Sequence, residues 1–127
     1  MSKKQTLCVD FDGVIHRYSR GWQDGSIYDE PVEGAFEALN KLAYKFNIVI
    51  FTTRATAGHE CHWTGSGGVR YEGAQAVQMW MWHQMHETLG ELAFSFVVTG
   101  EKIPAIAYID DRAVRFTNWA DVRKYWV

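Results

Sequence analysis

The chain alternates between short continuous runs of apolar residues and segments whose apolar residues recur every three or four positions. Continuous runs of this kind are typical of strands buried on both faces of a parallel sheet. They occupy residues 6–11, 47–52, 94–98 and 105–109. The helical spacing covers 31–45, where Pro31 fits a first turn, and 73–89, which Gly90 ends.

This order of strands and helices predicts an α/β fold. Right-handed crossovers between parallel strands place every carboxyl end at one edge, where such sheets bind ligands. We therefore expect a Rossmann-like three-layer α/β/α sandwich with a mostly parallel sheet, a further short strand over 122–127 and no large cap domain. Residues 14–28 and 53–72 lack a regular pattern and predict a flap and a lid-like loop within one domain, 1–127.

The composition is that of a globular protein without a membrane segment. Hydrophobic residues make up 47% of the chain and the net charge is -2, so the surface as a whole does not attract nucleic acid. No apolar run approaches the roughly 20 residues that cross a bilayer, and residues 1–6 lack the apolar stretch of a signal peptide. Cys8 in a buried strand and Cys61 in a polar loop are not expected to pair, which favours a cytoplasmic location.

Two pairs of aspartates are placed to meet at the carboxyl edge of the predicted sheet. Asp10 and Asp12 end the first strand on the same side, and Asp110 and Asp111 follow the fourth. Either pair alone also fits a turn or a helix cap. Together they are like charges that repel one another unless a cation lies between them or one is protonated. Hard oxygen ligands suit Mg²⁺, whose remaining coordination positions are commonly occupied by a substrate phosphate. The pattern therefore predicts a Mg²⁺ site for phosphate chemistry.

Hydroxyl and amino groups follow other strands at the same edge. Thr52 and Thr53 end the second strand, where a hydroxyl and adjacent N–H groups can hold a phosphoryl group, although threonine is also an ordinary strand-end residue. Lys102 precedes the fourth strand and can bind a phosphoryl oxygen, although a lone loop lysine is usually solvated. These residues extend the predicted metal site into a predicted phosphate site.

The same residues resemble the four motifs of the haloacid dehalogenase (HAD) superfamily of phosphohydrolases. The run 10–14 (DFDGV) is similar to its first motif, and Thr52 stands where its second has a Ser or Thr. Lys102 is similar to its third motif, and the pair 110–111 to its fourth. The four motifs occur in order, on the expected elements, and span nearly the whole chain.

The resemblance implies roles for these side chains. Asp10 would attack phosphorus and form an aspartyl-phosphate, while Asp12 would act as general acid and then as general base. Mg²⁺ would be held by Asp10, by Asp12 through its backbone carbonyl, and by the pair 110–111. Thr52 and Lys102 would orient and neutralise the phosphoryl oxygens. The expected activity is hydrolysis of a small phosphorylated metabolite or nucleotide.

Two short stretches are similar to polynucleotide-kinase-type 3′-phosphatase domains. They are 52–54 (TTR) and 109–112 (IDDR), and the similarity makes Arg54 a candidate phosphate ligand. A nucleic-acid end phosphatase is therefore an alternative, with a basic groove beside Asp10 as its distinguishing feature. A phosphotransferase and a noncatalytic phosphate-binding module are further alternatives on the same fold.

The predicted loops contain aromatic and histidine residues whose roles the pattern does not assign. Four aromatic residues could stack on a base or simply pack within the loops: Trp22, Tyr28, Trp63 and Tyr71. Residues 59–62 (HECH) lie too close together for an unstrained tetrahedral zinc site and are expected to be incidental polar residues of the loop. His16 has no evident partner, and an ordinary position in the flap is expected for it.

Overall fold

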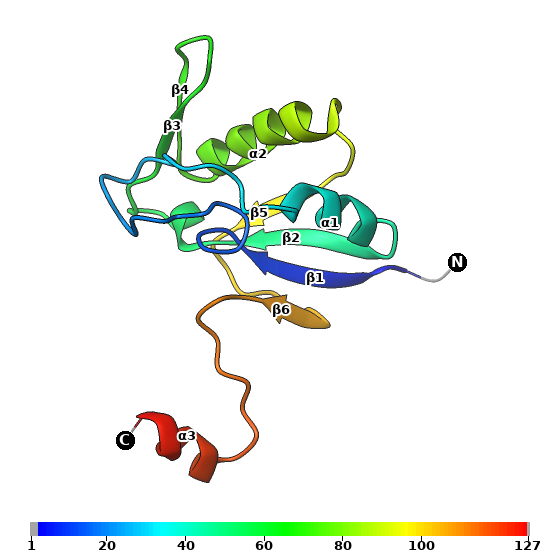
Figure 1. The fold of residues 1–127 in the computed structure, drawn as a ribbon, viewed down its shortest axis with the longest axis vertical. Helices are drawn as coiled ribbons and strands as arrows, with labels where there is room; N and C mark the ends of the chain where they lie inside the picture. Colours follow the sequence, from blue (N-terminus) through cyan, green and yellow to red (C-terminus); the bar gives the residue numbers. More distant parts are fainter. Residues whose placement is uncertain (1–2, 127) are drawn as a thin grey trace.

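The computed structural model describes residues 3–126 and contains one four-stranded sheet in the order β5–β2–β1–β6 (Figure 1). Its strands are β1 (Gln5–Asp10), β2 (Phe46–Phe51), β5 (Val97–Thr99) and β6 (Ala107–Ile109). All three neighbouring pairs are parallel. The predicted α/β class is thus confirmed, and this sheet is parallel throughout.

Helices α1 (Ala35–Leu42) and α2 (Gly73–Leu89) join the first three of these strands. The predicted span of α2 is confirmed, and Gly90 ends it with φ 78° and a hydrogen bond to His86. The prediction that the first helix begins at Pro31 is wrong. Pro31 bridges His16 of the flap, and Gly34 at φ 81° turns the chain before α1 begins.

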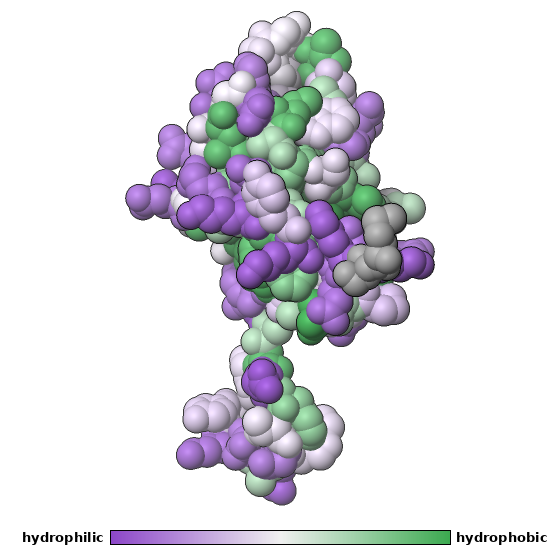
Figure 2. Space-filling model, turned by 90° about the vertical axis from the view of Figure 1, so that its right-hand side faces the viewer, coloured by the Kyte–Doolittle hydropathy of each residue, from purple (hydrophilic) through white to green (hydrophobic). Residues whose placement is uncertain are grey.

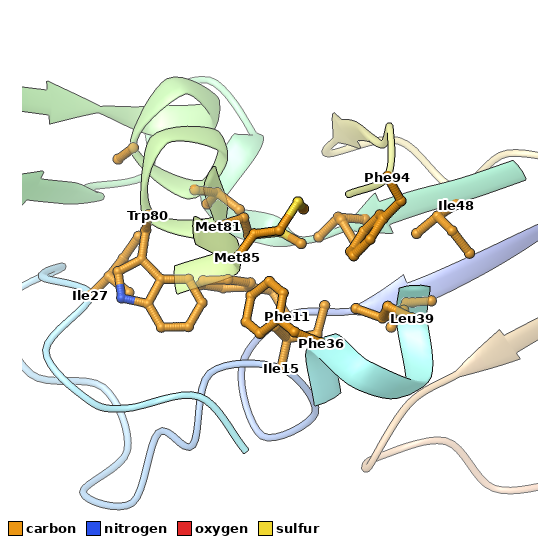
Figure 3. Close-up of a cluster of buried hydrophobic side chains, with 14 of the residues drawn as sticks. Phe11, Ile15, Ile27, Phe36, Leu39, Ile48, Trp80, Met81, Met85 and Phe94 are labelled. Carbon is orange, nitrogen blue, oxygen red and sulfur yellow. The ribbon is translucent and has the colours of Figure 1, made fainter. Parts of the chain in front are cut away.

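Both helices pack on the same face of the sheet. Leu7 and Val9 of β1 share a buried cluster with residues of both helices, among them Leu39 and Met81 (Figure 3). The flap joins this cluster through its own buried residues, including Ile15, which lies next to Phe11 and Phe36 in the same view. The core therefore fixes the start of the flap directly behind the carboxyl end of β1.

The connection from β5 to β6 joins the two edges of the sheet. It crosses the face opposite to the helices, since it contacts Cys8, whose side chain points away from the face of Leu7 and Val9. Its Ile103 lies against Cys8, and the carbonyl of Ile103 accepts a 2.5 Å hydrogen bond from the hydroxyl of Tyr108. Cys8 is buried under this connection, which carries Lys102 at its start. The strands β1, β2 and β5 are added in one direction across the sheet, and β6 is added on the opposite side of β1. Because crossovers between parallel strands are right-handed, this change places the last connection on the other face of the sheet.

The prediction of an irregular loop over 53–72 is wrong. The segment contains a 3₁₀ turn, η1 (Thr53–Ala55), and an antiparallel hairpin of β3 (His62–Thr64) and β4 (Arg70–Glu72). Its glycines obscured the hairpin, since Gly65 and Gly68 form the turn between strands that carry Trp63 and Tyr71.

The prediction of a strand over 122–127 is also wrong for the described residues. Helix α3 (Trp119–Trp126) occupies this place, and Asn118 accepts a hydrogen bond from the N–H of Asp121 at its start. The apolar residues 119, 122 and 126 have helical rather than alternating spacing.

Helix α3 lies apart from the sheet at the end of an extended segment (Figure 1). Figure 2 shows this part of the chain as a separate lobe joined to the body by a narrow neck. Within residues 3–126, helices therefore cover one face of the sheet, and the predicted third layer is not formed. No helix in the described part of the chain combines the length and hydrophobicity of a membrane span.

Candidate metal and phosphate site

Three aspartates meet where β1 and β6 end. Carboxylate oxygens of Asp10, Asp110 and Asp111 all lie within 4.8 Å of one another. Strands β1 and β6 are hydrogen-bonded neighbours, so their carboxyl ends bring the two segments together without any long-range loop. Asp10 is half-buried and the other two are exposed, which leaves the cluster open to a ligand from solvent.

The cluster has an electrostatic cost that falls mainly on Asp10. Burial and, after it, the nearby charges of Asp110 and Asp111 together raise the pKa of Asp10 from 3.8 to about 7, against the lowering effect of a hydrogen bond from the N–H of Phe11. That N–H lies 2.8 Å from Oδ1 of Asp10. A divalent cation between the carboxylates would offset this repulsion.

The stability of the metal-free protein is expected to depend on the ionisation of Asp10. Its folded-state pKa of about 7 exceeds the ordinary value of 3.8, so the folded state binds the proton more tightly. The resulting destabilisation is fully present above pH 7 and is relieved as the pH falls from there toward 4. In EDTA, the melting temperature of the native protein should therefore rise as the pH is lowered from about 8 to about 5.5, and that of Asp10→Asn should rise much less. Parallel pH profiles for the two proteins would contradict this assignment.

Gly13 allows the second acidic segment to approach the first. It has φ +84°, and a Cβ built on it would lie 2.2 Å from Oδ2 of Asp111. Any other residue would both strain the backbone and displace this carboxylate. The glycine of the 10–14 run is thus explained by the position of Asp111.

The Asp12 carboxylate contacts two basic side chains. Arg54 donates from Nε to both carboxylate oxygens, at 3.1 and 2.8 Å. Nδ1 of His16 lies 2.9 Å from Oδ1 of Asp12. The Asp12 side chain retains 20% exposure, so it is fixed in orientation yet accessible at the site.

His16 is buried, and its tautomer follows from its partners. The N–H of Asp29 donates to Nε2 at 3.0 Å, which makes Nε2 an acceptor. Nδ1 therefore carries the proton and donates to Asp12. His16 lies in the flap as expected, but the expectation that it has no clear partner is wrong, because both ring nitrogens are bound and Phe11, Trp80 and Tyr28 enclose its ring. The four-residue spacing between Asp12 and His16 was the feature of the sequence that could have indicated their contact.

Arg54 is 1% exposed and ties the site to the flap. Nη1 donates to the carbonyl of Gly25 at 2.8 Å, and Nη2 donates to the carbonyl of Ser26 at 3.5 Å. Cys61 is also buried, 3.7 Å from Nη1, so its expected place in a polar loop is wrong. The two cysteines are free, as predicted. Phosphate binding by Arg54 stays a prediction, since these contacts all go to protein atoms.

The remaining predicted phosphate ligands lie on neighbouring elements. Thr52 is buried, and its Oγ1 accepts a 3.2 Å hydrogen bond from the N–H of Arg54, whereas Thr53 is exposed. Nζ of Lys102 lies 4.7 Å from the centre of the Tyr108 ring. Lys102 also lines a cavity of about 170 Å³ together with Asp10, Cys8, Tyr108 and Asp110. Their phosphate contacts stay predictions.

The fold and the site define a class: an α/β protein with a carboxylate cluster, fit for a divalent cation, at the carboxyl edge of a parallel sheet. No known family model, curated protein or solved structure matches the chain. The resemblance to the HAD superfamily therefore rests on the motif residues of the chain itself.

Proposed function

We propose that this protein is a Mg²⁺-dependent phosphatase of the HAD superfamily, with a HAD-like fold, acting on a small phosphorylated metabolite or nucleotide. The observation that carries the proposal is the convergence of Asp10, Asp110 and Asp111 within 4.8 Å. A phosphate dianion cannot approach three carboxylates without a compensating cation. The motif order and the position of Lys102 on the cavity beside Asp10 support the same activity.

The donor set suits Mg²⁺ because carboxylate oxygens are hard ligands and two of the three are open to solvent. Asp10, Asp110 and Asp111 would hold the ion, with the backbone carbonyl of Asp12 as a further ligand. When bound, Mg²⁺ would neutralise the charge of the nucleophile and of the phosphate. The charges of Asp110 and Asp111, which help burial to raise the pKa of Asp10, would be offset in the same way.

In the proposed reaction, as the resemblance implies, the two aspartates have separate roles. An Asp10 carboxylate oxygen attacks phosphorus, and the bond from phosphorus to the ester oxygen breaks. Asp12, in its protonated form, gives its proton to that leaving oxygen. Asp12 then takes a proton from water as the water oxygen attacks phosphorus, which releases inorganic phosphate and restores Asp10. Arg54 and His16 hold Asp12 in one orientation during both steps.

A phosphatase panel tests the proposal directly. It combines sugar phosphates, nucleotides and 3′-phosphorylated oligonucleotides, each with Mg²⁺ and with EDTA. We expect saturable release of inorganic phosphate that requires the metal. Absence of hydrolysis across the panel, or equal rates in EDTA, would count against the proposal.

A further inference from the structure

The structure separates the four aromatic residues that the sequence offers for base stacking. Tyr28 lies 4.6 Å beneath the guanidinium of Arg20. The rings of Trp63 and Tyr71 stack on each other with their centres 6.3 Å apart, and both side chains pack against the hydrophobic core. Trp22 differs from these three because it retains 49% exposure.

Trp22 also contacts a side chain that holds the proposed proton donor, as Tyr28 does through His16. Its ring centre lies 5.3 Å from the guanidinium carbon of Arg54, whose Nε binds Asp12 at 2.8 Å. The Tyr18 ring lies 5.8 Å from the same guanidinium. A single buried side chain therefore separates the half-exposed indole from the proposed proton donor.

The flap that carries Trp22 is held in one conformation by its own hydrogen bonds. The hydroxyl of Tyr28 donates to the carbonyl of Gly21 at 2.8 Å and accepts from the N–H of Arg20 at 2.9 Å. Asp29 accepts from both the N–H and the hydroxyl of Ser19, at 2.9 and 2.5 Å. These bonds preorganise the turn that positions Trp22.

Backbone strain marks the same turn. Tyr18 has φ 56°, the one positive value among the non-glycine residues that the structure describes. Bulky side chains seldom adopt this conformation, and it persists where the surroundings impose it. Here it accompanies the placement of the Tyr18 ring beside Arg54. The strained residue thus lies in the same flap as Trp22, with its own ring beside Arg54.

We infer that Trp22 is a stacking platform for a planar aromatic group of the substrate, so the preferred esters are phosphates of nucleosides rather than of simple sugars. The inference rests on the proposed phosphatase function and deepens it. The indole presents a π-face that binds any base without reading its hydrogen-bonding edge. The guanidinium of Arg54 lies over the indole ring and helps to hold it in place by a cation–π contact.

Adenosine 5′-monophosphate and ribose 5-phosphate form a matched substrate pair, since they differ only in the base. In the native protein kcat/KM should be higher for the nucleotide. Trp22→Ala should reduce the ratio of the two kcat/KM values by about 5- to 100-fold, and Trp22→Phe should preserve most of it. Trp119→Phe is the control, because Trp119 is exposed on the distant helix α3. An unchanged ratio in Trp22→Ala would overturn the inference while leaving the phosphatase function intact.

Binding separates this result from a failure of the proposed function. Adenosine, which carries no phosphate, should quench tryptophan fluorescence in the native protein and in Trp119→Phe, and much less in Trp22→Phe or Trp22→Ala. That outcome without any hydrolysis would support the platform and reject the phosphatase. Equal adenosine affinity in the native protein and Trp22→Ala, measured by calorimetry, would reject the platform.

Discussion

Replacing Asp10 by Asn is expected to lower phosphate-ester hydrolysis by about 10⁴-fold or more while leaving the fold intact. The amide keeps the size of the carboxylate but is a poor nucleophile and brings no negative charge. It also removes the group whose pKa is raised to about 7 by burial and by neighbouring carboxylates. The metal-free variant should therefore be at least as stable as the native protein near pH 8. Initial rates of phosphate release and melting curves test the two halves of this expectation.

Two further variants separate loss of the nucleophile from loss of the metal. Asp110→Asn should raise the Mg²⁺ concentration needed for half-maximal activity, and excess Mg²⁺ should restore part of its rate. Asp10→Asn should stay inactive at every Mg²⁺ concentration. Glu37→Gln, an exposed carboxylate on α1, should behave like the native protein. Substantial turnover by Asp10→Asn would show that another group attacks phosphorus.

The central sheet could be predicted from the sequence because its signal is local. The apolar runs of β1 and β2 are continuous, and each is placed within a residue of its observed bounds. The position of α3 in the fold could not be predicted in this way. Apolar residues at 119, 122 and 126 are compatible with a helix. The position of this helix relative to the sheet, however, depends on the extended segment before it.

The acidic cluster was predictable for the same reason that the sheet was. Asp10 and Asp110 end neighbouring parallel strands, so topology alone brings them together. The partners of Asp12 were not predictable, because they arise from long-range packing. Arg54 is 42 residues from Asp12, and Gly25 and Ser26, whose carbonyls also bind Arg54, belong to an irregular flap. Sequence patterns carry little information on contacts of that kind.

The burial of Arg54 implies a large effect of Arg54→Met on both stability and activity. The substitution would remove the partner of the Asp12 carboxylate and leave two carbonyl groups without their donor. Breaking a buried ion pair from one side costs about 3–5 kcal/mol of the free energy of unfolding, a large fraction of the stability of a small domain. Arg54→Lys should also be destabilised, since one ammonium cannot match a guanidinium that binds on several sides. Urea unfolding measures both effects.

A matched pair of controls distinguishes burial from ion pairing as the cause. Arg70 and Glu72 form an ion pair of similar length, 3.2 Å, with side chains 57% and 71% exposed. Arg70→Met should therefore cost less than about 1 kcal/mol. Asp12→Asn combined with Arg54→Met should recover part of the stability that Arg54→Met alone loses, because no carboxylate without its guanidinium partner is left at position 12. If Arg54→Met and Arg70→Met cost the same, Arg54 is not the buried clamp on Asp12, and orientation of the proton donor must come from His16 alone.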